Sequence, residues 1–119
     1  MAAPQRIKKI NELVKRELGK IILKEIGFPR STLVTITQVE TSNNLQESKI
    51  FISVIPEKEE KNVFRVLEKE IYNLQQILNR RLAMRPVPKI KFVKDKGLRE
   101  AQRVEEILDN LKKSKKEDN

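Results

Sequence analysis

The chain has 119 residues, which is enough for one domain and too little for two. It contains neither Cys nor His, which excludes disulfides, thiolate or imidazole metal sites, cysteine nucleophiles and serine triads. Its 26 Lys and Arg residues against 17 Asp and Glu give a net charge of +9, which favours an anionic partner. No apolar run approaches the roughly 20 residues that span a bilayer, and the N-terminus lacks a secretory pattern. We therefore expect a cytoplasmic protein that does not bind membranes.

Residues 4–26 form the first predicted element, an amphipathic helix of about five to six turns. Pro4 suits its first turn, and Gly27 before Phe28-Pro29 is expected to end it with a positive φ. The prediction rests on apolar residues at steps of three and four: Ile7, Ile10, Leu13, Val14, Leu18, Ile21 and Ile22.

Two strands are predicted next, because β-branched residues dominate residues 32–41 and apolar residues fill residues 49–55. In the first strand Val34 and Ile36 fall on one parity and Val39 on the other. Either both faces are partly covered, or a bulge resets the face. A Ser and Asn turn cluster separates the two segments. The simplest arrangement is an antiparallel hairpin.

A long helix follows Pro56, where acidic residues favour a helix start. Its apolar period continues to about Ala83, some 23 residues, a length that leaves room for a kink. Pro86-Val87-Pro88 is expected to terminate it. Beyond this segment Ile90 and Phe92 alternate with lysines, which predicts a short third strand with one buried face.

The C-terminal part is predicted to contain a third amphipathic helix and a tail. The apolar positions of this helix are Ala101, Val104, Ile107, Leu108 and Leu111. Residues 112–119 are polar or charged throughout, which predicts disorder. The order helix, strand, strand, long helix, strand, helix indicates a single small α+β domain of two layers over residues 1–111, because three strands present one apolar face that helices must cover. If the second and third strands run parallel, the long helix is a right-handed crossover.

Charge is unevenly distributed: +5 in residues 1–30, −3 in residues 31–60, +7 in residues 61–94 and zero in residues 95–119. Residues 79–94 contain six cations and no acid. We interpret these cations as an anion-binding surface, because uncompensated positive charges repel one another. In the first helix Lys and Arg alternate with Glu, which is more typical of a solvated face.

The remaining residue types argue against other functions. Tyr72 and Phe92, the aromatic residues nearest the basic segment, are predicted to pack in the core, so binding would depend on phosphates and shape rather than on base stacking. Carboxylates such as Glu57, Glu59 and Glu60 lie at exposed positions beside Lys or Arg. With no Gly-rich phosphate loop among three glycines, we expect no enzymatic activity, no metal and no cofactor.

Several segments in a fixed order resemble one protein family, ribosome-binding factor A, over about residues 5–111. They are Arg6-Ile7, Ile10-Asn11-Glu12-Leu13, Phe28-Pro29-Arg30, residues 34–40 (VTITQVE), residues 48–54 (SKIFISV), residues 84–92 (MRPVPKIKF) and Asp95. Where the family has Ala-x-Gly to kink its helix pair, this chain has Glu70-Ile71-Tyr72. The sequence therefore leaves the kink open.

The resemblance implies a type II KH-like RNA-binding domain at residues 1–111, without the Gly-x-x-Gly clamp of ordinary KH domains. It implies a monomeric, non-catalytic assembly factor that binds the free 30S subunit and 16S rRNA during late maturation and rRNA processing, and that supports growth in the cold. The alternative is a basic module that binds an acidic partner protein. The predicted RNA-binding residues are Arg80, Arg81, Arg85, Lys89, Lys91, Lys94, Arg6, Lys8, Lys9 and Arg30.

Overall fold

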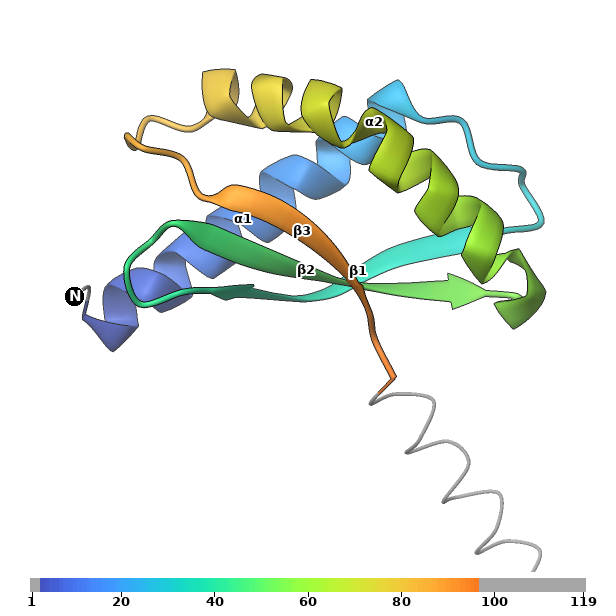
Figure 1. Cartoon of the computed structure of the whole chain (residues 1–119), viewed down its shortest axis with the longest axis horizontal. Helices are drawn as coiled ribbons and strands as arrows, with labels where there is room; N and C mark the ends of the chain where they lie inside the picture. The colour runs from blue at the N-terminus through green and yellow to red at the C-terminus, as the bar shows by residue number, and fades with distance from the viewer. Residues whose placement is uncertain (1–2, 97–119) are drawn as a thin grey trace, which may run out of the picture.

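The computed structural model describes residues 3–96. Its elements are α1 (Pro4–Glu25), β1 (Leu33–Thr41), β2 (Glu47–Ile55), a 3-10 turn η1 (Glu57–Glu59), α2 (Glu60–Arg81) and β3 (Lys89–Lys94). Helices α1 and α2 pack on a sheet of three strands (Figure 1), which confirms the α+β class and the predicted order over this range. The helix expected at residues 101–111 and the tail at residues 112–119 lie outside the described residues.

The sheet has the order β1-β2-β3, with β2 in the centre. β1 and β2 are antiparallel, which confirms the hairpin, and Leu33 pairs with Ile55 at its open end. β2 and β3 are parallel, so the chain must cross over between them, and α2 is that crossover. β2 begins two residues earlier than predicted, because Glu47 and Ser48 pair with the start of β3.

A bulge at Thr37 interrupts the β1–β2 ladder. Ile36 pairs with Ile52 and Gln38 with Phe51, which leaves Thr37 as the extra residue. The insertion changes the parity, so Ile36 before it and Val39 after it both face the helices. Of the two readings left open by the sequence, the bulge is confirmed.

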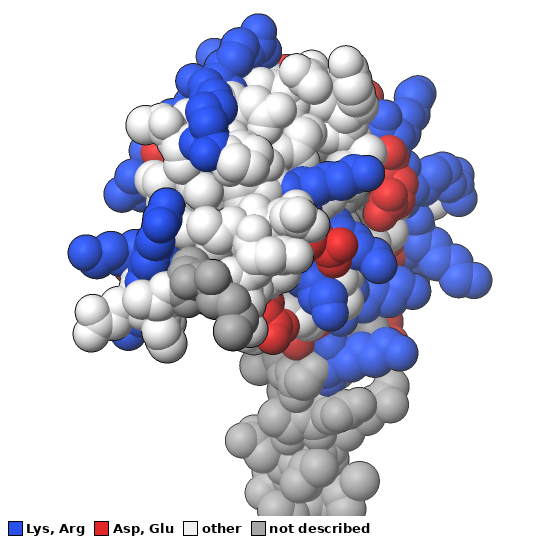
Figure 2. All heavy atoms as spheres, turned by 60° about the vertical axis from the view of Figure 1, so that its left-hand side comes forward, with Lys and Arg blue, Asp and Glu red and all other residues white. Residues whose placement is uncertain are grey.

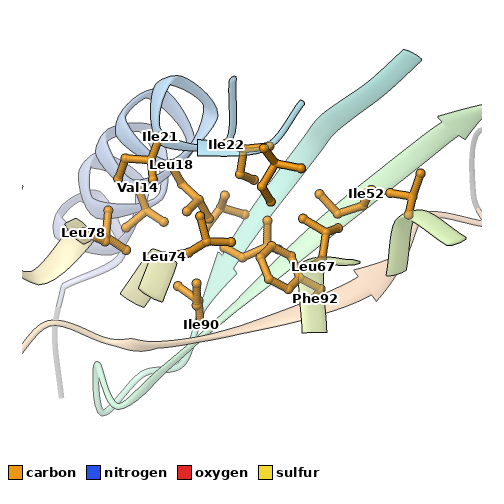
Figure 3. Packing of buried hydrophobic residues seen from close by; sticks show 14 of the residues in the cluster. Val14, Leu18, Ile21, Ile22, Ile52, Leu67, Leu74, Leu78, Ile90 and Phe92 are labelled. Atoms are coloured by element: carbon orange, nitrogen blue, oxygen red, sulfur yellow. The ribbon is translucent and has the colours of Figure 1, made fainter. Parts of the chain in front are cut away.

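The hydrophobic core lies between the two helices and the inner face of the sheet (Figure 3). α1 contributes Ile10, Val14, Leu18, Ile21 and Ile22; α2 contributes Val63, Leu67, Leu74 and Leu78; the strands contribute Val39, Ile50, Ile52, Val54, Ile90 and Phe92. Phe92 is buried as predicted. The prediction for Tyr72 is wrong, because its side chain is 75% exposed. Ile71 lies on the stripe of α2 that packs on the core. Tyr72, the next residue, points away from that stripe.

Both helices end at an extended residue whose side chain enters the core. Ile26 and Leu82 leave helical geometry, yet each backbone N–H still bonds to the carbonyl four residues earlier. The expected role of Gly27 is therefore wrong, since no described glycine has a positive φ. Ile26, at 8% exposure, is the extended residue at which α1 ends. α2 is a single helix, and Figure 1 shows its axis bending over the sheet.

Candidate nucleic-acid interface

Three basic segments lie along one side of the molecule, which we call the hairpin end: the start of α1, the start of β3, and the end of α2 with residues 82–88, the connector to β3 (Figure 1). Asn11 Oδ1 of α1 accepts a hydrogen bond of 2.9 Å from the backbone N–H of Thr41, beside the hairpin loop. On the other side of this loop, the backbone N–H of Lys89 donates to the carbonyl of Gln46 at 2.9 Å. The loop thus connects α1 with the start of β3.

Gln75 fixes the third segment to the second. Its Nε2 donates to the carbonyl of Pro88 at 3.1 Å and to Asn79 Oδ1 at 3.0 Å, and its Oε1 accepts from the N–H of Ile90 at 2.8 Å. These bonds hold β3 against α2 and so position Lys89 and Lys91. Sequence reasoning missed Gln75. Its signal is a polar residue four positions after Ile71 on the apolar stripe of α2.

Six of the predicted cations at the hairpin end, the free basic set, are exposed: Arg6, Lys8, Lys9, Arg80, Lys89 and Lys91. Within residues 3–96 their side chains make neither an ion pair nor a hydrogen bond. Figure 2 shows this end of the molecule, with Lys and Arg spheres around much of its edge and an uncharged area between them. The fold places these residues along one side of the molecule although they come from three distant parts of the sequence.

Arg85 also lies at the hairpin end, but its guanidinium is partly engaged. Its Nη1 donates to the carbonyls of Leu82 at 2.6 Å and Met84 at 2.7 Å. These carbonyls follow the last turn of α2, where helix acceptors lack partners. Three of the five guanidinium N–H donors lie on Nε and Nη2, so Arg85 can stabilise the connector and still bind an anion.

Arg81 and Lys94 have acidic partners, so the prediction of six uncompensated cations is wrong for these two. Arg81 Nη1 lies 3.4 Å from Glu17 Oε2 of α1. Lys94 Nζ lies 3.4 Å from Glu60 Oε1 of α2 and 5.9 Å from the centre of the Phe64 ring. Both carboxylates come from elements outside residues 79–94, and for this reason a count along the segment does not include them.

Glu17 stands at the centre of a separate cluster, the Glu17 cluster, with Arg16, Lys20 and Arg81. Its carboxylate is 3.4 Å from Arg16 Nε, 4.0 Å from Lys20 Nζ and 3.4 Å from Arg81 Nη1. Desolvation acts to raise the pKa of Glu17, but Lys20, Arg81 and Arg16 outweigh it and hold this pKa below its ordinary value. The carboxylate stays ionised and compensates part of the charge of these cations.

The predicted Arg30 lies at the other end of α1. It follows the helix, whereas Arg6 is in its first turn, and 22 residues at about 1.5 Å each separate the helix ends by about 33 Å. Arg30 is exposed and borders an apolar groove between α1 and β1. The structure therefore does not bring Arg30 together with the free basic set.

Lys49 is a cation at the hairpin end that sequence reasoning missed. It pairs in register with Lys91 on the face of the sheet away from the helices, the outer face. The signal in the sequence was its odd residue number in a strand whose even-numbered residues are buried. Glu40 and Glu47 are the register partners of Lys49 and Lys89 across the ladders. Acidic residues therefore interrupt the basic surface on this face of the sheet. The connector from α2 to β3 contains no acidic residue.

Within residues 3–96 no group of three or more acidic side chains is arranged to hold a metal ion. In the same range neither helix is long and apolar enough to cross a membrane.

Comparison with known proteins gives one consistent result. The family model for ribosome-binding factor A matches residues 6–108. The chain belongs to the ribosome-binding factor A family. Ribosome-binding factor A of Halothermothrix orenii is 35% identical over 115 residues, covering 96% of this chain and 94% of the relative. That of Clostridium novyi is 33% identical over 119 residues, covering 98% of both chains.

Solved structures of the ribosome-binding factor A family have the same fold. The crystal structure of the Thermus thermophilus protein matches with a TM-score of 0.65 at 25% identity, over 74% of this chain and 94% of that one. A model of the same protein, fitted into a cryo-electron microscopy map of its complex with the 30S subunit, matches with a TM-score of 0.61 over 71% of this chain and 90% of that one, also at 25% identity.

Proposed function

We propose that this member of the family is a non-catalytic assembly factor that binds the free 30S subunit through 16S rRNA in the cytoplasm. It would act as a monomer during late maturation and rRNA processing and support growth in the cold, with residues 1–111 as a KH-like RNA-binding domain. Family membership and the related protein in the 30S complex support the ribosomal part of this proposal. The free basic set supports the rRNA part.

The observation that carries the proposal is the free basic set. The hydrogen bonds of Asn11, Gln46 and Gln75 link its three segments, and within residues 3–96 the side chains of the set make no ion pair, with Glu47 as the register partner of Lys89. A phosphate backbone is the anion that best fits such a surface, because its charges repeat at regular intervals and each Lys or Arg that binds releases counterions. The set is therefore assigned to rRNA phosphates.

The aromatic residues favour recognition of backbone and shape over base stacking. Phe92 lies in the core, and Tyr72 is exposed on α2, nine residues before the end of the helix. Neither lies among the free basic set. We expect binding to depend strongly on salt and weakly on the bases.

Two pairs of substitutions test this assignment at equal net charge. Arg80→Gln with Lys89→Gln removes two charges at the hairpin end, whereas Lys24→Gln with Arg30→Gln removes two exposed charges near the other end of α1. Each phosphate contact on single-stranded rRNA contributes about −0.7 to the slope of log affinity against log salt. The first pair should make this slope shallower by about 1.4 and weaken binding to protein-free 16S rRNA. The second pair should leave the slope nearly unchanged.

The measurement is a binding titration at several salt concentrations with protein-free 16S rRNA and with 30S subunits. An equal or larger effect of Lys24→Gln with Arg30→Gln would show that the rRNA surface does not lie at the hairpin end. Binding to 30S subunits without salt-dependent binding to protein-free 16S rRNA would instead support the alternative, a module for an acidic partner protein.

A further inference from the structure

The outer face of the sheet has an apolar part that no described element covers. Leu33 and Ile55 are register partners at the open end of the hairpin and are 59% and 56% exposed. Phe51 and Val93, also partners in register, are half-buried on the same face, and the partners Ser53 and Thr35 lie between the two apolar pairs. We call the four apolar residues the outer apolar patch. It lies away from the hairpin end, where the same face has Lys49 and Lys91 instead.

The described chain ends beside this patch. The backbone N–H of Asp95 donates to the carbonyl of Ile52 at 2.9 Å. Thr37 Oγ1 donates to the Asp95 carboxylate and lies 3.3 Å from the carbonyl oxygen of Phe51. These bonds hold residue 95 near the Phe51 end of the patch. Figure 1 shows the chain leaving β3 on the side of the sheet away from α2.

The chain continues from this point for 23 residues, 97–119, and part of them has the pattern that the patch requires. Residues 101–111 contain an apolar stripe at helical spacing and would form a helix of about 16 Å. The patch itself extends along β2 from Phe51 to Ile55, four steps of the strand or about 13 Å. The family match reaches residue 108 and so includes most of the segment.

Reach and charge are also compatible. Leu33 lies two strands from β3, about 10 Å at the usual spacing, and residues 97–100 can extend about 13 Å. Residues 98–111 contain two basic and four acidic side chains, a net charge of −2. The patch borders Lys49 and Lys91, cations that attract such a segment.

We infer that residues 101–111 pack as a helix across the outer apolar patch of the same chain, so that the sheet has helices on both faces. The apolar contacts of this docking involve no residue of the free basic set, of which Lys91 borders the patch. It is independent of the proposed rRNA binding, because the contact is apolar and within one molecule.

The test compares amide NMR spectra and melting temperatures of chains ending at Lys96, at Leu111 and at Asn119, without RNA. The chain ending at Leu111 should match the full chain. The chain ending at Lys96 should melt lower and show shifts at Leu33, Phe51, Ile55 and Val93, with core signals such as Leu18 unchanged.

A matched pair in the full chain covers the case in which the shorter chain does not fold. Ile107→Lys places a charge in the apolar stripe, and Gln102→Lys places the same charge on the opposite side of the predicted helix. Ile107→Lys should shift the four patch signals, and Gln102→Lys should not. Unchanged patch signals with Ile107→Lys would overturn the inference. Shifts that appear only on raising the protein concentration would also overturn it, because the occupant would then be a second copy.

Discussion

The free basic set and the Glu17 cluster differ in their electrostatic surroundings, although Arg80 and Arg81, one residue from each, are neighbours in the sequence. Arg80 is exposed with no acidic partner within residues 3–96, whereas Arg81, the next residue, lies 3.4 Å from Glu17. α2 ends at this point and α1 packs beside it, so one residue faces solvent and the next faces a carboxylate on α1. The same residue type at consecutive positions thus makes no ion pair in one case and an ion pair in the other within residues 3–96.

This difference indicates which cations are available to an anion. A cation beside a carboxylate has part of its charge compensated, and an incoming phosphate must compete with that carboxylate. A cation without a partner releases counterions on binding and contributes fully to the salt dependence. Net charge per segment is therefore a weaker guide to a binding surface than the positions of the acids in the fold.

The largest expected effect comes from removing the side chain that positions part of the free basic set. Gln75→Ala removes the partners of the Ile90 N–H and the Pro88 carbonyl, so we expect a loss of about 2 kcal/mol in the free energy of unfolding. The melting temperature should fall on the order of 10 °C. The adjacent, exposed Gln76 provides the control, and Gln76→Ala should change stability little. Thermal melts measure both, and equal melting temperatures would show that Gln75 does not hold β3.

A smaller effect is expected from Glu17→Gln, which removes the carboxylate of the Glu17 cluster. The lowered pKa of Glu17 stabilises the folded chain above its ordinary value of 4.5, and this contribution is lost as the pH falls through the folded-state pKa. Glu17→Gln should therefore lower the melting temperature at pH 7, and its difference from the parent chain should shrink in acid. Glu12→Gln, an exposed position on the same helix, is the control. A difference that stays constant with pH would contradict this role.

The sequence predicts the fold well because the core signal is local. The spacing of Val14, Leu18 and Ile21 identifies the buried face of α1, and the alternation of Ile90 and Phe92 that of β3. The change of side-chain parity along β1 predicts a bulge as one of two possibilities. The end of α1 is predicted to within one residue, but its geometry is not, because Ile26 is extended and buried and no described glycine has a positive φ.

The candidate site is only partly predictable, because its charges depend on contacts between distant residues. The basic segment at residues 79–94 is visible in the sequence, but the pairing of Arg81 with Glu17 and of Lys94 with Glu60 requires the packing of the helices and β3. The role of Gln75 likewise depends on Pro88 and Ile90 lying beside α2. A polar residue on an apolar stripe indicates such a contact without identifying its partner.

We propose that the availability of a cation, rather than its place in a basic segment, decides whether it binds rRNA. Arg80→Gln and Arg81→Gln change net charge equally at adjacent positions, and titrations with protein-free 16S rRNA at several salt concentrations compare them directly. We expect Arg80→Gln to make the salt slope shallower by about 0.7 and Arg81→Gln to change it little. Equal changes in the two slopes, or a larger change for Arg81→Gln, would contradict the claim.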